Sequence, residues 1–147
     1  KRKRKLMKSK KVIFVCTGNS CRSQMAEGMV RQWAGDLIDV RSAGSHPADA
    51  VAPLAIEAMT EIGIDISGQY TKSLDTMKNE LFDWVITVCD NAKAVCPVFQ
   101  SADGLAKVLH WSVEDPHGGS IDDYRRARDD LAGRIGNWLK GEFGITV

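Results

Sequence analysis

The sequence has no apolar run of about 18 residues, the length that a membrane-spanning helix requires, so we expect no membrane partner. The apolar stretch Val12 to Val15 is too short for the core of a signal peptide. Four cysteines in 147 residues are too few for a disulfide scaffold, and their spacings of five, sixty-eight and seven positions match no common zinc pattern. We therefore predict a cytoplasmic protein with reactive, reduced thiols and no metal.

Basic residues are scarce outside the N-terminus. Eight of the 20 lysines and arginines lie in the first 11 residues, which leaves 12 basic against 19 acidic residues, a net charge of −7. This acidic body gives no sign of a nucleic-acid surface. Residues 1–10 are interpreted as a disordered basic leader upstream of a start near Met7, although such a run also serves as an RNA, membrane or localisation patch. Residues 11–147, without repeats or a linker, are predicted to form one domain, and we expect a monomer.

Hydrophobic periodicity predicts alternating strands and helices. Short β-branched apolar runs predict strands at 11–16, 38–43, 82–89 and 107–111. Apolar residues at helical intervals predict helices at 23–33, 53–62 and 124–139. This alternation is typical of the α/β class, and we predict a single-domain, three-layer αβα fold with a central, four-stranded parallel sheet.

Three chemically competent residues fall where strands are predicted to end. Cys16 and Cys89 end predicted strands, and Asp115 closely follows another. Ligands of such sheets bind beyond the carboxyl ends of the strands. These residues from distant parts of the sequence are therefore expected at one rim.

The segment from Cys16 to Arg22 has the pattern of an anion-binding loop. A thiol separated by five residues from an arginine, between a strand and a helix, would lie beneath backbone N–H groups that bind a tetrahedral oxyanion. Gly18 and Asn19 tolerate left-handed backbone angles. Arg22 can clamp two oxygens, and the same field should lower the pKa of Cys16. The predicted anion-binding residues are Thr17, Gly18, Asn19, Ser20, Cys21, Arg22 and Ser23.

Other candidate residues have competing interpretations. Cys21 is better explained as a packed structural thiol than as a reactive one. Asp115, before a proline, fits a general acid that protonates a departing oxygen, but it also fits an ordinary turn. The histidines lack compelling partners and are interpreted as structural or surface residues; they are His46, His110 and His117.

Cys89 and Cys96 are a candidate redox pair. In one regular helix their Cα atoms would lie about 10.5 Å apart, whereas a disulfide tolerates only about 7 Å. We therefore predict that the segment 90–97 is looped or rearranges when a disulfide forms. Two unrelated core cysteines would show the same spacing.

The segment from Val15 to Gly28 resembles the motif of thioredoxin-coupled arsenate reductases, which share the low-molecular-weight tyrosine phosphatase fold. Further similar segments are Ser42 to Gly44, Ala55 to Met59, Ile64 to Ser67, the Cys89 and Cys96 pair, and Asp115 with Pro116. The likeness covers nearly everything after Met7.

The resemblance implies a relay of three thiols with arsenate as substrate and thioredoxin as electron donor. Cys16 attacks arsenate with the help of Asp115. Cys89 then attacks Cys16 and releases arsenite, and Cys96 attacks Cys89 to leave a disulfide for thioredoxin. Arsenic detoxification would be the biological role.

Some family members also bind potassium near the loop. Asn19, Glu27 and Ser42 are similar to three of its ligands, but Lys72 replaces the acidic fourth. Its ammonium could take the place of the ion, which argues against potassium dependence and leaves no cofactor expected.

Two rival functions use the same residues. A low-molecular-weight phosphotyrosine phosphatase would employ Cys16, Arg22 and Asp115 in the same way, but it usually has aromatic residues after the Asp-Pro pair and does not need Cys89 and Cys96. A weak phosphatase side activity fits either enzyme. A redox switch without catalysis would use the cysteine pair only as a sensor.

Overall fold

The computed structural model describes residues 10–89 and 99–147 and is built around one parallel sheet. Its four strands, in spatial order, are β2 (Ile38–Gly44), β1 (Lys10–Cys16), β3 (Trp84–Thr87) and β6 (Lys107–His110). Every neighbouring pair is parallel. The predicted α/β fold with a four-stranded parallel sheet is confirmed.

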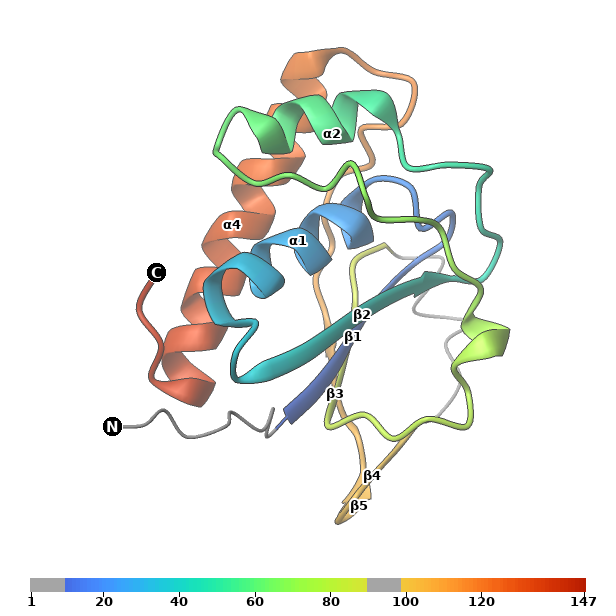
Figure 1. The fold of residues 1–147 in the computed structure, drawn as a ribbon, viewed down its shortest axis with the longest axis vertical. Helices are drawn as coiled ribbons and strands as arrows, with labels where there is room; N and C mark the ends of the chain where they lie inside the picture. Colours follow the sequence, from blue (N-terminus) through green and yellow to red (C-terminus); the bar gives the residue numbers. More distant parts are fainter. Residues whose placement is uncertain (1–9, 90–98) are drawn as a thin grey trace.

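Three α-helices of the described residues flank the sheet (Figure 1). They are α1 (Arg22–Ala34), α2 (Pro53–Thr60) and α4 (Ile121–Phe143), and a 3₁₀ turn spans Leu74–Thr76. Helix α1 packs against β2 and α4, and α2 packs against α4. No helix in the described ranges has both the length and the apolar character needed to cross a membrane.

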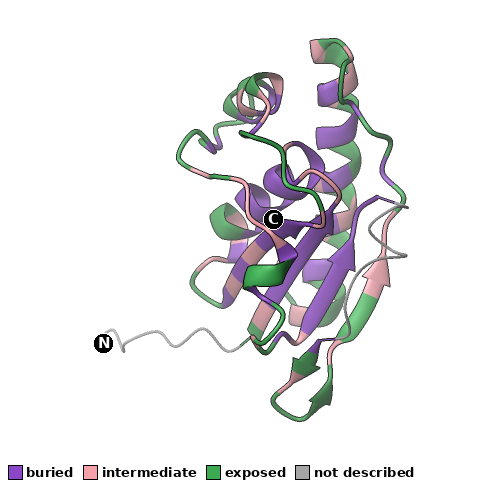
Figure 2. Ribbon diagram, turned by 90° about the vertical axis from the view of Figure 1, so that its right-hand side faces the viewer, coloured by how far each residue is buried: buried purple, intermediate pink, exposed green. Residues whose placement is uncertain are grey.

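The core confirms the faces expected from the sequence pattern. The interior of β1, from Val12 to Val15, is fully buried, as expected for a central strand covered on both sides (Figure 2). Met25 on α1 and Leu131 on α4 are equally inaccessible. Each such side chain contributes roughly 1.5–3 kcal/mol when it is fully buried, so this packing holds β1 and the start of α1 in place.

Element boundaries differ from the predictions where tertiary contacts intervene. The predicted strand 82–89 is ordered as a strand only over β3, because the N–H of Phe82 donates to Gln100 at 2.8 Å instead of joining the sheet. Gln100–Ser101 (β4) and Gly104–Leu105 (β5) form a hairpin too short for periodicity to reveal. Helix α4 extends beyond 124–139 at both ends, beginning with a capping box of Ser120 and Asp123.

Candidate active site

The loop between β1 and α1 turns its carbonyl groups outward. The carbonyl oxygens of Thr17, Gly18 and Ser20 accept hydrogen bonds of 2.9, 2.8 and 2.9 Å from N–H groups of the segment 46–52. Carbonyls that face this segment leave the loop's N–H groups free to point into its concave side, as an anion nest requires. The N–H of Asn19 does so and donates to the sulfur of Cys16.

Asn19 shapes the loop with both its backbone and its side chain. Its φ of 51° is left-handed, a region that asparagine tolerates better than most residues. The buried amide donates to Ser23 Oγ at 2.8 Å and to Ser42 Oγ at 3.0 Å. Its oxygen accepts from Gln24 Nε2 at 3.1 Å and from the Lys72 N–H at 2.8 Å. The side chains of Asn19 and Ser23 therefore support the loop from behind.

Arg22 is held beneath the loop by carbonyl groups from two other segments. Its Nη1 donates to Val113 O at 2.7 Å and to Val88 O at 3.4 Å, and Nη2 lies 3.6 Å from Asp115 Oδ2. Its buried Nε has no hydrogen-bond partner in the described part of the chain. A buried guanidinium donor is costly to leave unpaired, and an oxyanion in the loop would satisfy it.

Cys16 and Cys89 meet although they lie 73 positions apart in sequence. A hydrogen bond joins their side chains, and Cys89 Sγ also lies 3.3 Å from Thr17 Oγ1. The contact with Cys89 raises the pKa of Cys16, burial raises it further, and the charge of Arg22 acts in the opposite direction. We expected the loop to lower this pKa, but in the reduced state the second thiol outweighs the loop.

Cys21 occupies a different environment from Cys16. It is buried, and its thiol donates to the hydroxyl of Tyr124 at 3.6 Å. Burial and this contact raise the pKa of Tyr124. The position agrees with the expected packed thiol, and it identifies Tyr124, which periodicity marked only as part of a helix, as a support for the loop.

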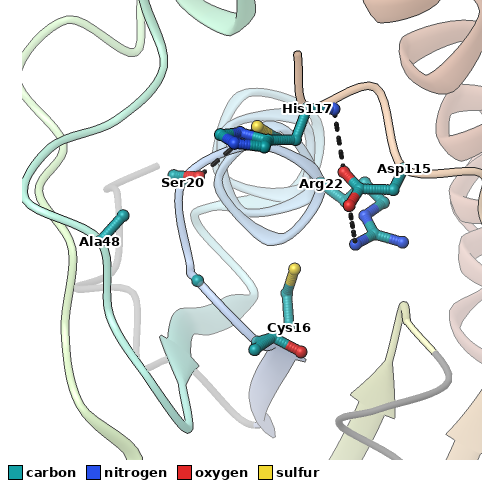
Figure 3. Close-up of a pocket in the computed structure, with 9 residues that line it drawn as sticks. Cys16, Ser20, Arg22, Ala48, Asp115 and His117 are labelled. Carbon is teal, nitrogen blue, oxygen red and sulfur yellow. Dashed lines mark hydrogen bonds and ion pairs between the residues drawn. The ribbon is translucent and has the colours of Figure 1, made fainter. Parts of the chain in front are cut away.

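A cavity of about 320 Å³ opens above Cys16 (Figure 3). Its lining residues are Cys16, Thr17, Gly18, Ser20, Cys21, Arg22, Ala48, Asp115 and His117. The structure therefore brings Cys16, Arg22 and Asp115 together as predicted, whereas Cys96 lies outside the described residues. Asp115 Oδ1 accepts the N–H of His117 at 2.9 Å, which orients the carboxylate.

The three histidines have separate fates. His46 is exposed outside the cavity, and His110 lies beside Thr87, with Nδ1 2.7 Å from the hydroxyl. Both fit the expected structural or surface role. His117 is also exposed, and in addition it lines the cavity above Cys16. Its position two residues after Asp115 was the only available signal in the sequence.

The place where the family resemblance implies potassium is filled by the chain itself. Lys72 Nζ lies 3.4 Å from Glu27 Oε1 and donates to Tyr70 O at 2.8 Å, while Ser42 donates to the same Glu27 oxygen. Burial lowers the pKa of Lys72, and the nearby Glu27 opposes this shift. An ammonium among these oxygens leaves a donor set that does not fit a potassium ion.

We expect the activity and stability of the protein to be independent of potassium. Replacing KCl by NaCl at equal ionic strength should change kcat/KM by less than about twofold, since the Lys72 ammonium and the Arg31 guanidinium, whose Nη2 lies 2.6 Å from Glu27 Oε2, already compensate Glu27. Lys72→Met should lower the unfolding free energy by roughly 2 kcal/mol, measured in a denaturant titration. Lys78→Met is the matched control. It removes the same ammonium group from an exposed ion pair, in which Lys78 Nζ lies 3.7 Å from Asp75 Oδ1. A potassium-specific activation of the native enzyme would contradict this account.

Comparison with known proteins places this architecture in a family. The model of the family described as low molecular weight phosphotyrosine protein phosphatase matches residues 11–142. The chain therefore belongs to the low molecular weight phosphotyrosine protein phosphatase family.

Within that family, the chain is similar to arsenate reductases. One from Bacillus cereus is 42% identical over 135 residues, which cover 91% of this chain and 98% of that protein. A solved arsenate reductase in a phosphate-binding state is 36% identical, with a TM-score of 0.75 over 90% of this chain and 98% of that one. A thioredoxin-dependent arsenate reductase of Corynebacterium glutamicum is 32% identical, with a TM-score of 0.70 over 90% of this chain and 61% of that one.

Proposed function

We propose that the protein is an arsenate reductase that uses Cys16, Cys89 and Cys96 in sequence and is regenerated by thioredoxin. One observation carries the proposal: a second thiol, Cys89, lies against the anion loop, with its Sγ 3.3 Å from Thr17 Oγ1 and its side chain in contact with Cys16. Hydrolysis of a phosphorylated cysteine needs only water, whereas reduction of an arsenylated cysteine needs a second thiol at that position. The similarity to arsenate reductases supports the same function.

The first step joins arsenic to Cys16. The thiolate attacks arsenate, a sulfur–arsenic bond forms, and one arsenate oxygen leaves as water. Asp115, which lines the same cavity, supplies a proton to the departing oxygen. Arg22 and the inward N–H groups bind the remaining oxygens and stabilise their charge.

The second step transfers two electrons. Cys89 as thiolate attacks the sulfur of Cys16, so a disulfide forms while the sulfur–arsenic bond breaks. The electron pair of that bond stays with arsenic, which leaves as arsenite in oxidation state III. Because the two side chains are already in contact, little movement of Cys16 is required for this step.

The third and fourth steps restore the thiols. Cys96 attacks Cys89, which releases Cys16 and leaves a disulfide between Cys89 and Cys96. A dithiol of thioredoxin then reduces that disulfide by exchange and becomes oxidised itself. The part of Cys96 rests on the sequence, and the part of thioredoxin is supported by the thioredoxin-dependent relative. A reducing compartment such as the cytoplasm suits this chemistry.

Phosphatase activity is the second candidate function. Cys16, Arg22 and Asp115 could hydrolyse a phosphate ester without Cys89, and the family model is named for such enzymes. The cavity would contact the oxygens of the anion, and arsenate and phosphate have the same tetrahedral set of oxygens. We therefore expect slow phosphatase activity beside the reductase activity.

A coupled assay tests the proposal on the whole chain of 147 residues. Arsenate, thioredoxin, thioredoxin reductase and NADPH are combined, and arsenite is quantified by arsenic speciation. We expect many arsenites per enzyme, one NADPH per arsenite, and no turnover without thioredoxin. Oxidation that stops after one equivalent would instead indicate a redox switch, and phosphate-ester hydrolysis without arsenite formation would indicate a phosphatase.

A further inference from the structure

His117 is placed to contact whatever occupies the anion cavity. In Figure 3 its imidazole extends over the anion loop beside Ser20, and the space above Cys16 lies between it and Asp115 with Arg22. The residue is exposed and lines this cavity. None of the steps described above uses this residue.

The loop that carries His117 is anchored on both sides. Pro116 is buried, and its carbonyl accepts the N–H of Gly119 at 2.9 Å. Gly118, with φ of 80°, adopts the left-handed angle that this tight turn requires. The N–H of Ser120 donates to Asp123 Oδ2 at 2.8 Å, which ties the loop to the start of α4. The imidazole is therefore presented by an ordered turn.

Positive charge in the cavity is limited. Arg22 is the one permanent cation among the described lining residues, and it is already 3.6 Å from the carboxylate of Asp115. A dianionic oxyanion above a thiolate adds further negative charge that Arg22 alone does not balance. Among the described residues that line the cavity, His117 is the other one whose side chain type can carry a positive charge.

Other titratable groups lie in or near the two cavities that His117 lines. They are Glu114 and Asp115 on its own loop, Asp123 on α4, Cys16, Cys21 and Arg22 across the cavity, Tyr124 in contact with Cys21, and Asp49 next to Ala48 in sequence. The carboxylates among them carry negative charge, and Arg22 carries positive charge.

From these positions we infer that protonated His117 is a binding residue for the outer oxygen of the tetrahedral oxyanion. It acts as a second cationic contact beside Arg22 and makes the affinity for arsenate and phosphate pH-dependent. This inference deepens the proposed function, since it rests on the same anion site, but it concerns binding and not electron transfer. An imidazole ordinarily changes its charge between about pH 5 and 8, so the added affinity should appear below neutral pH.

The test measures the Kd of inorganic phosphate by calorimetry for the native protein and His117→Gln from pH 5.5 to 8.5. Phosphate itself titrates in this range, but the ratio of the two Kd values at each pH cancels that effect. We expect His117→Gln to bind about 5–10 times more weakly at pH 5.5, the loss of one exposed charge-assisted hydrogen bond, and less than about twice as weakly at pH 8.5. His117→Lys should bind more tightly than the native protein at pH 8.5, because its charge persists.

His46→Gln is the matched control, since His46 is exposed and lies outside the cavity lining; its Kd ratio should stay near one. A ratio near one for His117→Gln at every pH would overturn the inference while leaving the anion site intact. If the native protein binds no phosphate at any pH, the anion site itself, and the proposed function with it, is wrong. Equal Kd values with a lower kcat in His117→Gln would also overturn a binding role.

Discussion

Cys89→Ala should abolish thioredoxin-coupled arsenite formation and leave hydrolysis of p-nitrophenyl phosphate intact. Arsenite leaves only when a second thiol attacks Cys16, so the variant has no route from the arsenylated cysteine to arsenite. Hydrolysis uses Cys16, Arg22 and Asp115, none of which is changed. The two activities, measured on one preparation, therefore separate the roles of the two cysteines.

The same variant should make Cys16 more reactive at neutral pH. The hydrogen bond between the Cys16 and Cys89 side chains is the largest cause that raises the pKa of Cys16, whereas Arg22 lowers this pKa. Without Cys89, the pKa of Cys16 falls and a larger fraction is thiolate at pH 7. The rate of Cys16 alkylation by iodoacetamide is measured at pH values from 5.5 to 9, with mass spectrometry as the readout. The midpoint of this pH profile should lie at lower pH in the variant than in the native protein.

Cys16→Ser provides the control for these measurements, because it should lose both activities. Continued arsenite turnover in Cys89→Ala would exclude the relay. An unchanged pH profile of alkylation would show that Cys89 does not raise the pKa of Cys16.

Gly44→Ala should disable the anion loop, because β2 ends directly against that loop. Gly44 pairs in register with Cys16, and a Cβ there would lie 2.4 Å from Thr17 O and 2.9 Å from Cys16 O. Backbone oxygens cannot rotate away, so the loop itself must move. Overpacking of this kind costs roughly 1–3 kcal/mol of stability, and a displacement of about 1 Å lowers activity by about 10²-fold.

Steady-state kcat/KM with arsenate and a thermal melt would measure both effects. Gly68→Ala is the matched control, because a Cβ at Gly68 meets nothing within 4 Å. The control should retain native kcat/KM to within about twofold. Native-like kinetics in Gly44→Ala would mean that the loop tolerates displacement and that its geometry is less demanding than proposed.

The sequence predicted those parts of the fold that local patterns encode. The β-branched run of β1 and the helical spacing of Met25 and Met29 correctly located the first strand and helix, since burial imposes its period on neighbouring residues. The ends of β3 and the hairpin of β4 and β5 were missed. Hydrogen bonds such as the one from Phe82 to Gln100 join segments that no local pattern relates.

The candidate site residues were predictable to different degrees. Five residues separate Cys16 from Arg22 beyond one strand, so their proximity follows from chain geometry alone. The pKa of Cys16 did not follow from the loop, because the nearest group that perturbs it, Cys89, comes from another strand. The role of Cys96 stays a prediction.

The sequence by itself predicted the anion loop that begins at Cys16, the parallel sheet and the family. The loop depends on residue spacing within one segment, and the sheet and the family depend on short local patterns that recur along the chain. Only the tertiary structure decided that Cys89 contacts Cys16, that the Lys72 ammonium lies beside Glu27, that Gly44 closes the underside of the loop, and that His117 extends over its mouth. Those contacts join residues separated by 27 to 101 positions in the printed sequence. Local periodicity carries no information at that range, where packing of the whole chain sets which side chains meet.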